Sequence, residues 1–241
     1  MTASPRPRQQ SSVKRCTGTV VIMPETDYLT VTQAAYDTVA SDYARLLKGA
    51  LGRMPWDRAV LAAFAESVLL DRLGPVADVG CGAGRITGYL HQLGLDAFGV
   101  DLSPGMLALA RQALPGLRFV EGSMTALDLP DASLGGVVAW YSLIHIPPMK
   151  VPAVLSEFCR VLVPGGQLVL AFQVGAEGRN LQQAYRHAIS LEAYRMQPDQ
   201  LEQQLQAAGL PVHARVVRDP DDLETVPQAY LLARKSTAAP S

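Results

Sequence analysis

Apolar residues recur along the chain with two different spacings, and the spacing changes near residue 75. In residues 32–47 and 56–70 they fall on one face of a helix. From residue 76 onward, short apolar runs typical of buried strands alternate with segments of helical spacing. The predicted strands cover residues 76–79, 97–101, 117–120, 137–141 and 167–172, and the predicted helices cover residues 85–93, 104–113 and 151–161. This alternation predicts an α/β fold, a parallel doubly wound sheet with helices on both faces.

The same pattern divides the chain into parts. The two early helices predict an N-terminal helical cap over residues 28–75, and the alternating region predicts one domain over residues 76–235. Within that domain, the polar segment at about 176–205 predicts a helical insertion. Two late apolar runs, residues 212–217 and 228–233, complete a mostly parallel sheet of seven strands.

Both ends of the chain depart from this pattern. Residues 1–27 predict a disordered tail, and residues 236–241 a second, short tail. The first tail lacks the continuous apolar core of a signal peptide. Met23 stands just before the first patterned segment, and it is an alternative start of translation.

Composition and charge narrow the class of protein. The 21 Lys and Arg residues nearly balance the 22 Asp and Glu residues, so no basic field attracts nucleic acid or an anionic membrane. Cys16, Cys81 and Cys159 lie far apart, which argues against a metal site or a disulfide scaffold. No apolar run approaches the roughly 20 residues of a membrane-spanning helix. We therefore expect a cytoplasmic protein, a monomer or homodimer, that acts on a small molecule without a metal.

A glycine-rich loop follows the first predicted strand. The sequence from Asp78 to Gly84 reads Asp-Val-Gly-Cys-Gly-Ala-Gly, and such a turn lets the backbone approach a ligand at the start of a helix. The dinucleotide fingerprint would place its third glycine where this chain has Arg85, so the spacing disfavours NAD. Asp101 ends the second strand 19 residues beyond Gly82 (101 − 82), where a carboxylate can accept hydrogen bonds from ribose hydroxyls. The ligand therefore carries a ribose.

Four segments in this order resemble the class I S-adenosylmethionine-dependent methyltransferases. VADVGCGAGRITGYL (76–90) looks like their first motif, and FGVDLSPGMLALAR (98–111) looks like their acidic second-strand motif. Residues 119–148 are similar to their third and fourth strands, and CRVLVPGGQLVLAF (159–172) is similar to the segment that leads into strand five. The resemblance covers nearly everything but the tails. It implies a Rossmann-like fold and S-adenosyl-L-methionine as cofactor, with S-adenosyl-L-homocysteine as product.

The resemblance also implies where the cofactor is held. Asp78 and the backbone of the glycine loop would hold the methionine end, and Asp101 would hold the ribose. Many relatives contact the adenine with an Asp after strand three, but this chain has Gly-Ser-Met there, so the contact passes to Ser123 or to the backbone. Tyr36 resembles a lid tyrosine, and Leu102 and Met106 would flank the adenine. The implied cofactor residues are Tyr36, Asp78, Gly80, Cys81, Gly82, Gly84, Asp101, Leu102, Met106, Ser123, Met124 and Trp140.

Methyl transfer is an in-line displacement at carbon, and it requires alignment of the nucleophile, exclusion of water and removal of a proton. His145 follows the fourth strand at the edge where open α/β sheets bind ligands, so it is the first candidate for the general base. Tyr141 is the second candidate. A structural role for His145, bonded to a backbone carbonyl, is the alternative. His187 and Tyr194 are either acceptor contacts or part of a solvated face.

The expected activity is methyl transfer to an N or O nucleophile of a small molecule. Two alternatives remain open from the sequence. The first is an NAD-linked oxidoreductase on the same fold, although the chain lacks a Tyr-x-x-x-Lys dyad. The second is a noncatalytic protein that binds S-adenosylmethionine, because methyl transfer requires few fixed side chains.

Overall fold

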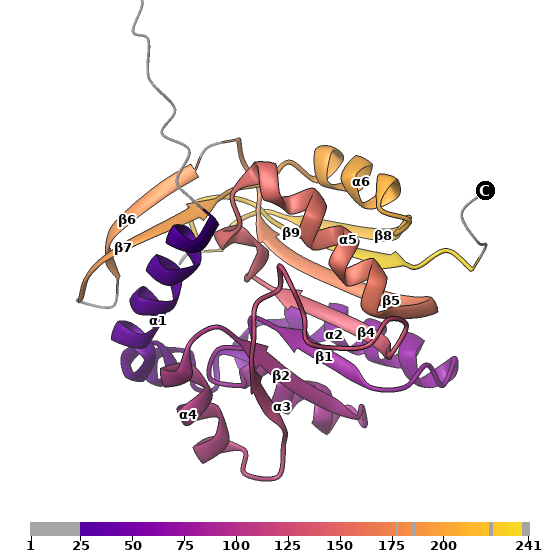
Figure 1. The fold of residues 1–241 in the computed structure, drawn as a ribbon, viewed down its shortest axis with the longest axis horizontal. Helices are drawn as coiled ribbons and strands as arrows, with labels where there is room; N and C mark the ends of the chain where they lie inside the picture. The colour runs from indigo at the N-terminus through magenta and orange to yellow at the C-terminus, as the bar shows by residue number, and fades with distance from the viewer. Residues whose placement is uncertain (1–24, 177, 185–186, 222–223, 238–241) are drawn as a thin grey trace, which may run out of the picture.

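The computed structural model describes residues 25–176, 178–184, 187–221 and 224–237. Its centre is a seven-stranded sheet in the order β3-β2-β1-β4-β5-β9-β8 (Figure 1). The first five strands are parallel, and β9 runs antiparallel to both β5 and β8. This confirms the predicted doubly wound, mostly parallel sheet. The strands are β1 (Val76–Val79), β2 (Ala97–Asp101), β3 (Phe119–Glu121), β4 (Leu134–Trp140), β5 (Leu162–Gln173), β8 (Val212–Arg218) and β9 (Gln228–Arg234).

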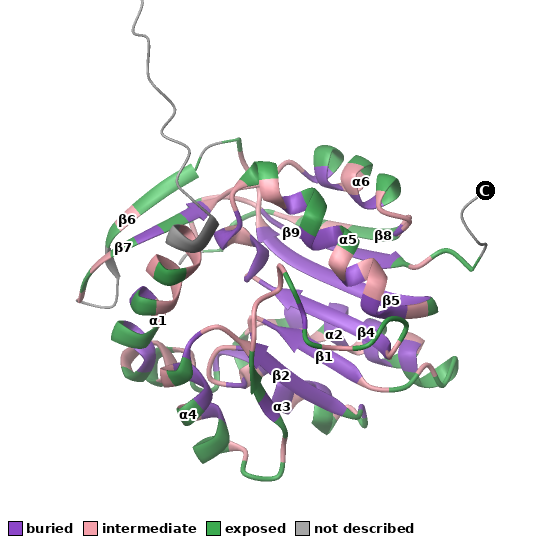
Figure 2. Ribbon diagram, viewed as in Figure 1, coloured by how far each residue is buried: buried purple, intermediate pink, exposed green. Residues whose placement is uncertain are grey.

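The central strands are apolar throughout because helices cover both faces of the sheet. All seven residues of β4 are buried (Figure 2), and from Val137 to Trp140 they alternate between two cores. Val137 and Ala139 pack with α5 (Val151–Val161) and α6 (Pro198–Ala207) on one face. Val138 packs with α2 (Pro55–Leu70) and α3 (Arg85–Gln92) on the other. The helix α4 (Pro104–Ala113) covers β3 at the sheet's edge.

The two N-terminal helices have different roles, which the prediction of one cap over 28–75 did not distinguish. The helix α2 belongs to the sheet domain, where Phe64 is buried against β4. A Cβ atom on Gly136 would lie 2.8 Å from the Phe64 ring, so the glycine allows this close packing. The helix α1 (Glu25–Leu47) instead leaves the sheet and contacts α4. Helical spacing reveals an apolar face but not its partner, so the sequence could not separate the two helices.

The segment 176–205 is not a helical insertion. It forms an antiparallel hairpin of β6 (Gly178–Ala184) and β7 (His187–Tyr194), and only α6 after it is helical. Alternate residues of β7 are exposed, and Leu191 between them is buried, which is the period of a strand. Ile189 of this strand packs against the inner face of α1, beside which the hairpin lies in Figure 1.

Other predicted boundaries agree with the structure to within a few residues. The strands β4 and β5 begin three and five residues earlier than predicted, because they pair beyond their most apolar stretch. The helix α1 begins at Glu25, inside the predicted tail. The remainder of that tail and Met23 lie outside the described residues. Within the described ranges, no helix combines the length and apolarity that a membrane span requires.

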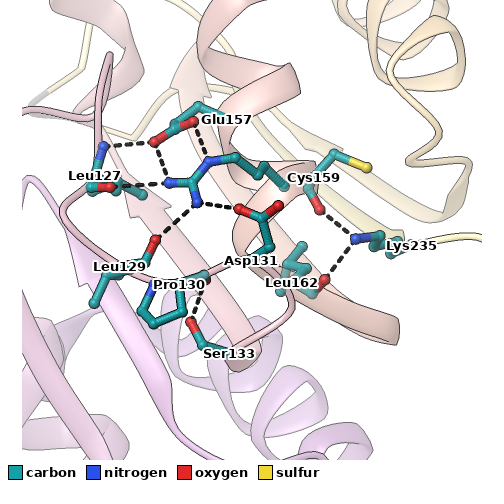
Figure 3. A network of polar contacts seen from close by, with 10 residues as sticks. Leu127, Leu129, Pro130, Asp131, Ser133, Glu157, Cys159, Leu162 and Lys235 are labelled. Carbon is teal, nitrogen blue, oxygen red and sulfur yellow. Dashed lines mark hydrogen bonds and ion pairs between the residues drawn. The ribbon is translucent and has the colours of Figure 1, made fainter.

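The long connection between β3 and β4 is tied to the helix α5 by one guanidinium group (Figure 3). Arg160 donates to the carboxylates of Asp131 and Glu157 and to the carbonyl oxygens of Leu127 and Leu129, over distances of 2.6–3.0 Å. Charge-assisted bonds of this kind fix geometry as well as adding stability. The connection that leaves the ligand-binding edge after β3 is thereby held against the body of the domain.

Candidate functional site

A cavity lies at the C-terminal ends of β1, β2 and β4, beneath the helix α1. It contains about 710 Å³ of empty space, including its open mouth. One wall is formed by the glycine loop and the end of β2, and another by the segment that follows β4. The helix α1 closes it with Tyr36 and Tyr43. This is the edge at which parallel α/β sheets bind ligands, because loops after neighbouring strands diverge there.

The glycine loop is wedged between β2 and the segment after β4. Gly80 and Gly82 have φ angles of +78° and +53°, in the left-handed region that favours glycine. A Cβ atom on Gly80 would lie 2.2 Å from Cβ of Ser142. The amides of Gly80 and Cys81 donate to the carbonyl oxygen of Val100 at 2.7 and 3.1 Å. The loop is therefore held in position by its own backbone before any ligand arrives.

Asp101 connects this loop to the helix α4. Its Oδ2 accepts from the Gly82 amide at 2.7 Å, and its Oδ1 accepts from the Ser103 amide at 2.9 Å. Burial raises the pKa of Asp101, and these two hydrogen bonds partly oppose that rise. Because each carboxylate oxygen has capacity for a further bond, Asp101 can accept from two hydroxyl groups in the cavity. Ser103 also caps α4, because its hydroxyl oxygen accepts from the Met106 amide at 3.0 Å.

Asp78 lies beneath the loop and is fully buried. Its Oδ2 accepts from the Thr87 hydroxyl at 2.7 Å, whereas its Oδ1 has no hydrogen-bond partner among the described residues. Burial raises the pKa of Asp78 to about 7. An unsatisfied buried oxygen is costly unless a donor reaches it. The site therefore suits a ligand that brings a positively charged donor to the loop.

His145 lies across the cavity from the loop, at the end of the short 3-10 helix η2 (Leu143–His145). Its Nδ1 is 2.8 Å from the carbonyl oxygen of Glu192 in the hairpin, and its Nε2 is 2.6 Å from the hydroxyl of Tyr36. Burial lowers the pKa of His145 below its ordinary value of 6.5, and the bond to the Glu192 carbonyl partly offsets this. The histidine is therefore neutral near neutral pH.

Trp140 and Tyr141 form an aromatic floor at the end of β4. The indole Nε1 of Trp140 donates to the buried carboxylate of Asp57 at 3.3 Å, and its ring stacks on Tyr230 at 5.3 Å. Tyr141 has a φ angle of +55°, an uncommon conformation that is frequent at functional sites. Burial, with Tyr230 and Asp57 nearby, raises the pKa of Tyr141. Tyr141 is thus poorly suited to act as the general base.

The structure brings most of the predicted site residues to one cavity. Those on its wall are Tyr36, Gly80, Gly82, Asp101, Leu102, Met124, Trp140, Tyr141 and His145. The others lie behind the wall. Met106 is fully buried against the helix α1, the Cys81 thiol packs close to Gly99, and the Ser123 hydroxyl pairs with Thr125 at 2.7 Å. Gly84 begins α3 and packs on the Phe119 ring, and Asp78 is buried beneath the loop.

Several residues of the site carry no local signal in the sequence. Asp57 is an acidic residue in the first turn of a helix, a common position, yet it is buried and supports Trp140. Glu192 contributes only its backbone carbonyl to His145. His187 of β7 does not line the cavity and instead pairs with Asp42 of α1 at 2.7 Å. Tyr194 ends β7 and also lies off the cavity wall.

Comparison with known proteins bears on what this cavity binds. Residues 76–166 match the model of a methyltransferase domain, and this range contains the glycine loop, Asp101 and His145. Over this range the chain is therefore similar to methyltransferase domains. The cofactor of this family is S-adenosylmethionine. The fold agrees, since the chain has the expected sheet with helices on both of its faces.

Individual relatives align over part of their length. The chain is 37% identical over 117 residues to a demethylmenaquinone methyltransferase of Beutenbergia cavernae, an alignment that covers 48% of this chain and 46% of the relative. It is 35% identical over 103 residues to a malonyl-[acyl-carrier protein] O-methyltransferase of Pectobacterium atrosepticum, covering 43% and 39%. The chain thus spans about half or less of the length of the curated relatives it matches.

Solved structures share the fold over more of the chain. The 1,6-didemethyltoxoflavin-N1-methyltransferase of Burkholderia thailandensis superposes with a TM-score of 0.63, covering 89% of this chain and 92% of that one. The sequence identity is 22%, so the likeness concerns the fold alone. That protein was crystallised with S-adenosylhomocysteine and 1,6-didemethyltoxoflavin bound.

Proposed function

We propose that the protein transfers the methyl group of S-adenosylmethionine to an N or O nucleophile of a small molecule bound under the helix α1. The observation that carries the proposal is one cavity with two unlike walls. The glycine loop and Asp101 form the first, and the Tyr36–His145 pair lies across from it. When bound, the cofactor supplies an electrophilic methyl group on a positively charged sulfur. The chain must hold both reactants in line and remove a proton.

The residues around the loop fit this cofactor. Asp101 has acceptor capacity for the two ribose hydroxyls, and the loop backbone at Gly80 and Gly82 is open to the cavity. The cofactor's ammonium group would bring positive charge to the unsatisfied Oδ1 of Asp78, which would lower the cost of burying that carboxylate. Leu102 and Met124, both on the wall, would contact the adenine.

The rest of the cavity favours a small and largely uncharged acceptor. Aromatic rings from α1 and from the end of β4 dominate it, and Asp101, on the cofactor wall, is the only Asp, Glu, Lys or Arg residue that lines it among the described residues. Burying a charged acceptor there would cost free energy that no side chain offsets. The names of the relatives support acceptors of this size, and one of them also names an acceptor held on a carrier protein.

Calorimetry with S-adenosylhomocysteine and NAD tests the cofactor assignment. We expect micromolar binding of S-adenosylhomocysteine and no binding of NAD, and the opposite result would contradict the proposal in favour of an oxidoreductase. Methyl transfer is then measured by mass spectrometry with 1,6-didemethyltoxoflavin, a demethylmenaquinone, a malonyl thioester and simple phenols and amines. Binding of S-adenosylhomocysteine without turnover of any acceptor would favour a noncatalytic cofactor-binding protein.

A further inference from the structure

Three segments that are far apart in the sequence meet at the imidazole of His145. The helix α1 contributes the Tyr36 hydroxyl, η2 contributes the imidazole, and β7 contributes the backbone carbonyl of Glu192. The rings of Tyr36 and His145 meet edge to face, with centroids 5.2 Å apart. Both side chains line the cavity that holds the glycine loop and Asp101. The contacts therefore form a continuous chain from the cavity into the hairpin.

The direction of each hydrogen bond follows from the chemistry of its partners. A carbonyl oxygen can only accept, so Nδ1 of His145 must carry a proton that it donates to Glu192. In a neutral imidazole the other nitrogen, Nε2, then has only a lone pair. Because Nε2 is 2.6 Å from the Tyr36 oxygen, it accepts the phenolic proton. The lone pair that would make His145 a base is thus already occupied by Tyr36.

We infer that Tyr36 is the catalytic residue that meets the acceptor's proton, and that His145, oriented by the Glu192 carbonyl, drives it as the second member of a relay. This rests on the proposed methyl transfer and assigns its base. His145 alone, as the sequence suggested, would have to displace Tyr36 before it could reach an acceptor. The relay removes that requirement, because Tyr36 also lines the cavity and already contacts Nε2.

The proton balance of the relay is complete. The acceptor's N–H or O–H proton moves to the Tyr36 oxygen while the phenolic proton moves to Nε2, so Tyr36 is unchanged and His145 becomes an imidazolium. The acceptor's electron pair forms the new bond to the methyl carbon, and the electrons of the broken carbon–sulfur bond stay on sulfur. The Nδ1 proton stays on Nδ1 throughout, in its hydrogen bond to the Glu192 carbonyl oxygen. The extra proton leaves His145 for solvent after the products depart.

The surroundings of the pair agree with a neutral resting state. On its α1 side Tyr36 packs edge to face against Tyr43, whose ring centroid is 6.0 Å away. The Glu192 carboxylate turns away from the imidazole and accepts from Asn180 at 2.6 Å. Asp101 is on the opposite wall, held by two backbone amides. The imidazole is therefore buried among neutral groups, and its pKa is lowered.

Nuclear magnetic resonance tests the resting geometry without any turnover. Protein labelled with ¹⁵N-histidine is studied alone and with saturating S-adenosylhomocysteine, and the signals of His145 among the four histidines are identified with the His145→Gln variant. We expect the Nδ1-protonated tautomer, and we expect the Nε2 resonance to move in Tyr36→Phe, which lacks the phenolic donor. An Nε2-protonated tautomer, or an Nε2 resonance that does not shift in Tyr36→Phe, would overturn the relay.

Kinetics with the fastest acceptor of the panel tests the relay itself. Tyr36→Phe and His145→Gln should each lower kcat by about 10²–10⁴-fold. The double variant should be no slower than the slower single variant, because the two groups act as one unit. The wild-type kcat/KM should fall at acid pH as His145 is protonated, and His145→Gln should lose this limb. Thr38→Val is the control, since it removes an exposed hydroxyl elsewhere on α1.

The outcomes separate the relay from the proposed function. Failure of S-adenosylhomocysteine to bind would refute the function. The relay would be refuted if S-adenosylhomocysteine bound normally, Tyr36→Phe kept full activity and His145→Gln lost activity. His145 would then be the direct base. Full activity of both variants would show that the reaction needs no base from this pair. Multiplicative losses in the double variant would mean that the two side chains act independently.

Discussion

The two walls of the cavity are built in different ways. Most of the cofactor wall comes from a single stretch of the chain, from Asp78 to Ser103, and its contacts are mostly between backbone groups and Asp101. The acceptor wall is assembled from α1 and η2, with the hairpin β6–β7 behind it, and its central contact joins residues 109 positions apart. The first wall is a local structure carried by the sheet, whereas the second exists only when three elements dock.

This difference has consequences for what each wall can tolerate. A wall formed by neighbouring strands and their loops is rigid because its backbone is already paired in the sheet. A wall formed by a docked helix and a hairpin depends on few polar ties and can vary between relatives without loss of the fold. Substitutions in the first wall should therefore act on stability and cofactor binding, and substitutions in the second should act on turnover.

The largest expected effect is in the cofactor wall, at Gly80. The new Cβ atom of Gly80→Ala would overlap with Ser142, which costs about 1–3 kcal/mol, and the left-handed backbone adds about 1–2 kcal/mol. Gly82→Ala should lose only the backbone part, because its Cβ atom meets no atom closer than 3.7 Å. Chemical denaturation measures both. Gly116→Ala, in open space, is the control, and equal stability of all three variants would contradict the rigid wall.

The next effect concerns affinity for the cofactor. Asp101→Ala removes an acceptor of two backbone amides and of the proposed ribose hydroxyls, so binding of S-adenosylhomocysteine should weaken by roughly 1–3 kcal/mol. Calorimetry measures the dissociation constant. The control is Asp96→Ala, an exposed carboxylate at the opposite end of the same strand. If Asp101→Ala bound as tightly as the control, the ribose assignment would be wrong.

The cofactor wall was also the predictable half of the site. The glycine loop and Asp101 are set by local sequence, because each follows directly from a buried strand and its turn. The parallel strands were predictable for the same reason, since apolar runs between glycines and helices have few other interpretations. The sequence does not show which of these residues line the cavity and which lie behind its wall. Met106, for example, is buried behind the wall, because the apolar pattern of a helix does not show which of its sides faces a ligand.

The acceptor wall could not be derived in this way. His145 was identifiable by its place after β4, but its partners Tyr36 and Glu192 are brought to it by packing between distant elements. The sequence predicts a helix where the hairpin lies, because the polar composition of the segment masks the alternation around Leu191. The contribution of Glu192 is a backbone carbonyl, which any residue at that position would supply. A single sequence contains no signal for such a contact.

The pH dependence of cofactor binding probes the cofactor wall through Asp78. Its pKa is raised to about 7, so the carboxylate becomes ionised as the pH rises from 6 to 8. A charged carboxylate attracts the cofactor's ammonium group, and affinity should therefore increase by up to about tenfold over this range. Calorimetry at several pH values measures the slope. Asp78→Asn should flatten it, and a wild-type profile as flat as that of the variant would contradict the assignment.

Asp78 should also lower the stability of the protein without ligand. Its folded pKa lies above the ordinary value of 3.8, so the folded state binds the proton more tightly than the unfolded chain. By linkage, the free energy of unfolding falls as the pH rises from about 4 to about 7. Asp78→Asn should therefore be more stable than the wild type at pH 8 and should lose this advantage at pH 4. The same substitution would weaken cofactor binding, which separates a functional carboxylate from a structural one.

The smallest expected effect is in the acceptor wall, at the tie between α1 and the hairpin. His187 pairs with Asp42, but both side chains are partly exposed (37% and 30%), so the pair contributes only about 0.2–1 kcal/mol. His187→Gln should speed hydrogen exchange in α1 and in β7, while binding of S-adenosylhomocysteine stays unchanged. Arg215→Gln, which breaks an exposed pair on β8, is the control. Faster exchange in the cofactor loop instead would show that the two walls are not independent, because the loss of a tie on α1 would then have reached the backbone that holds Asp101.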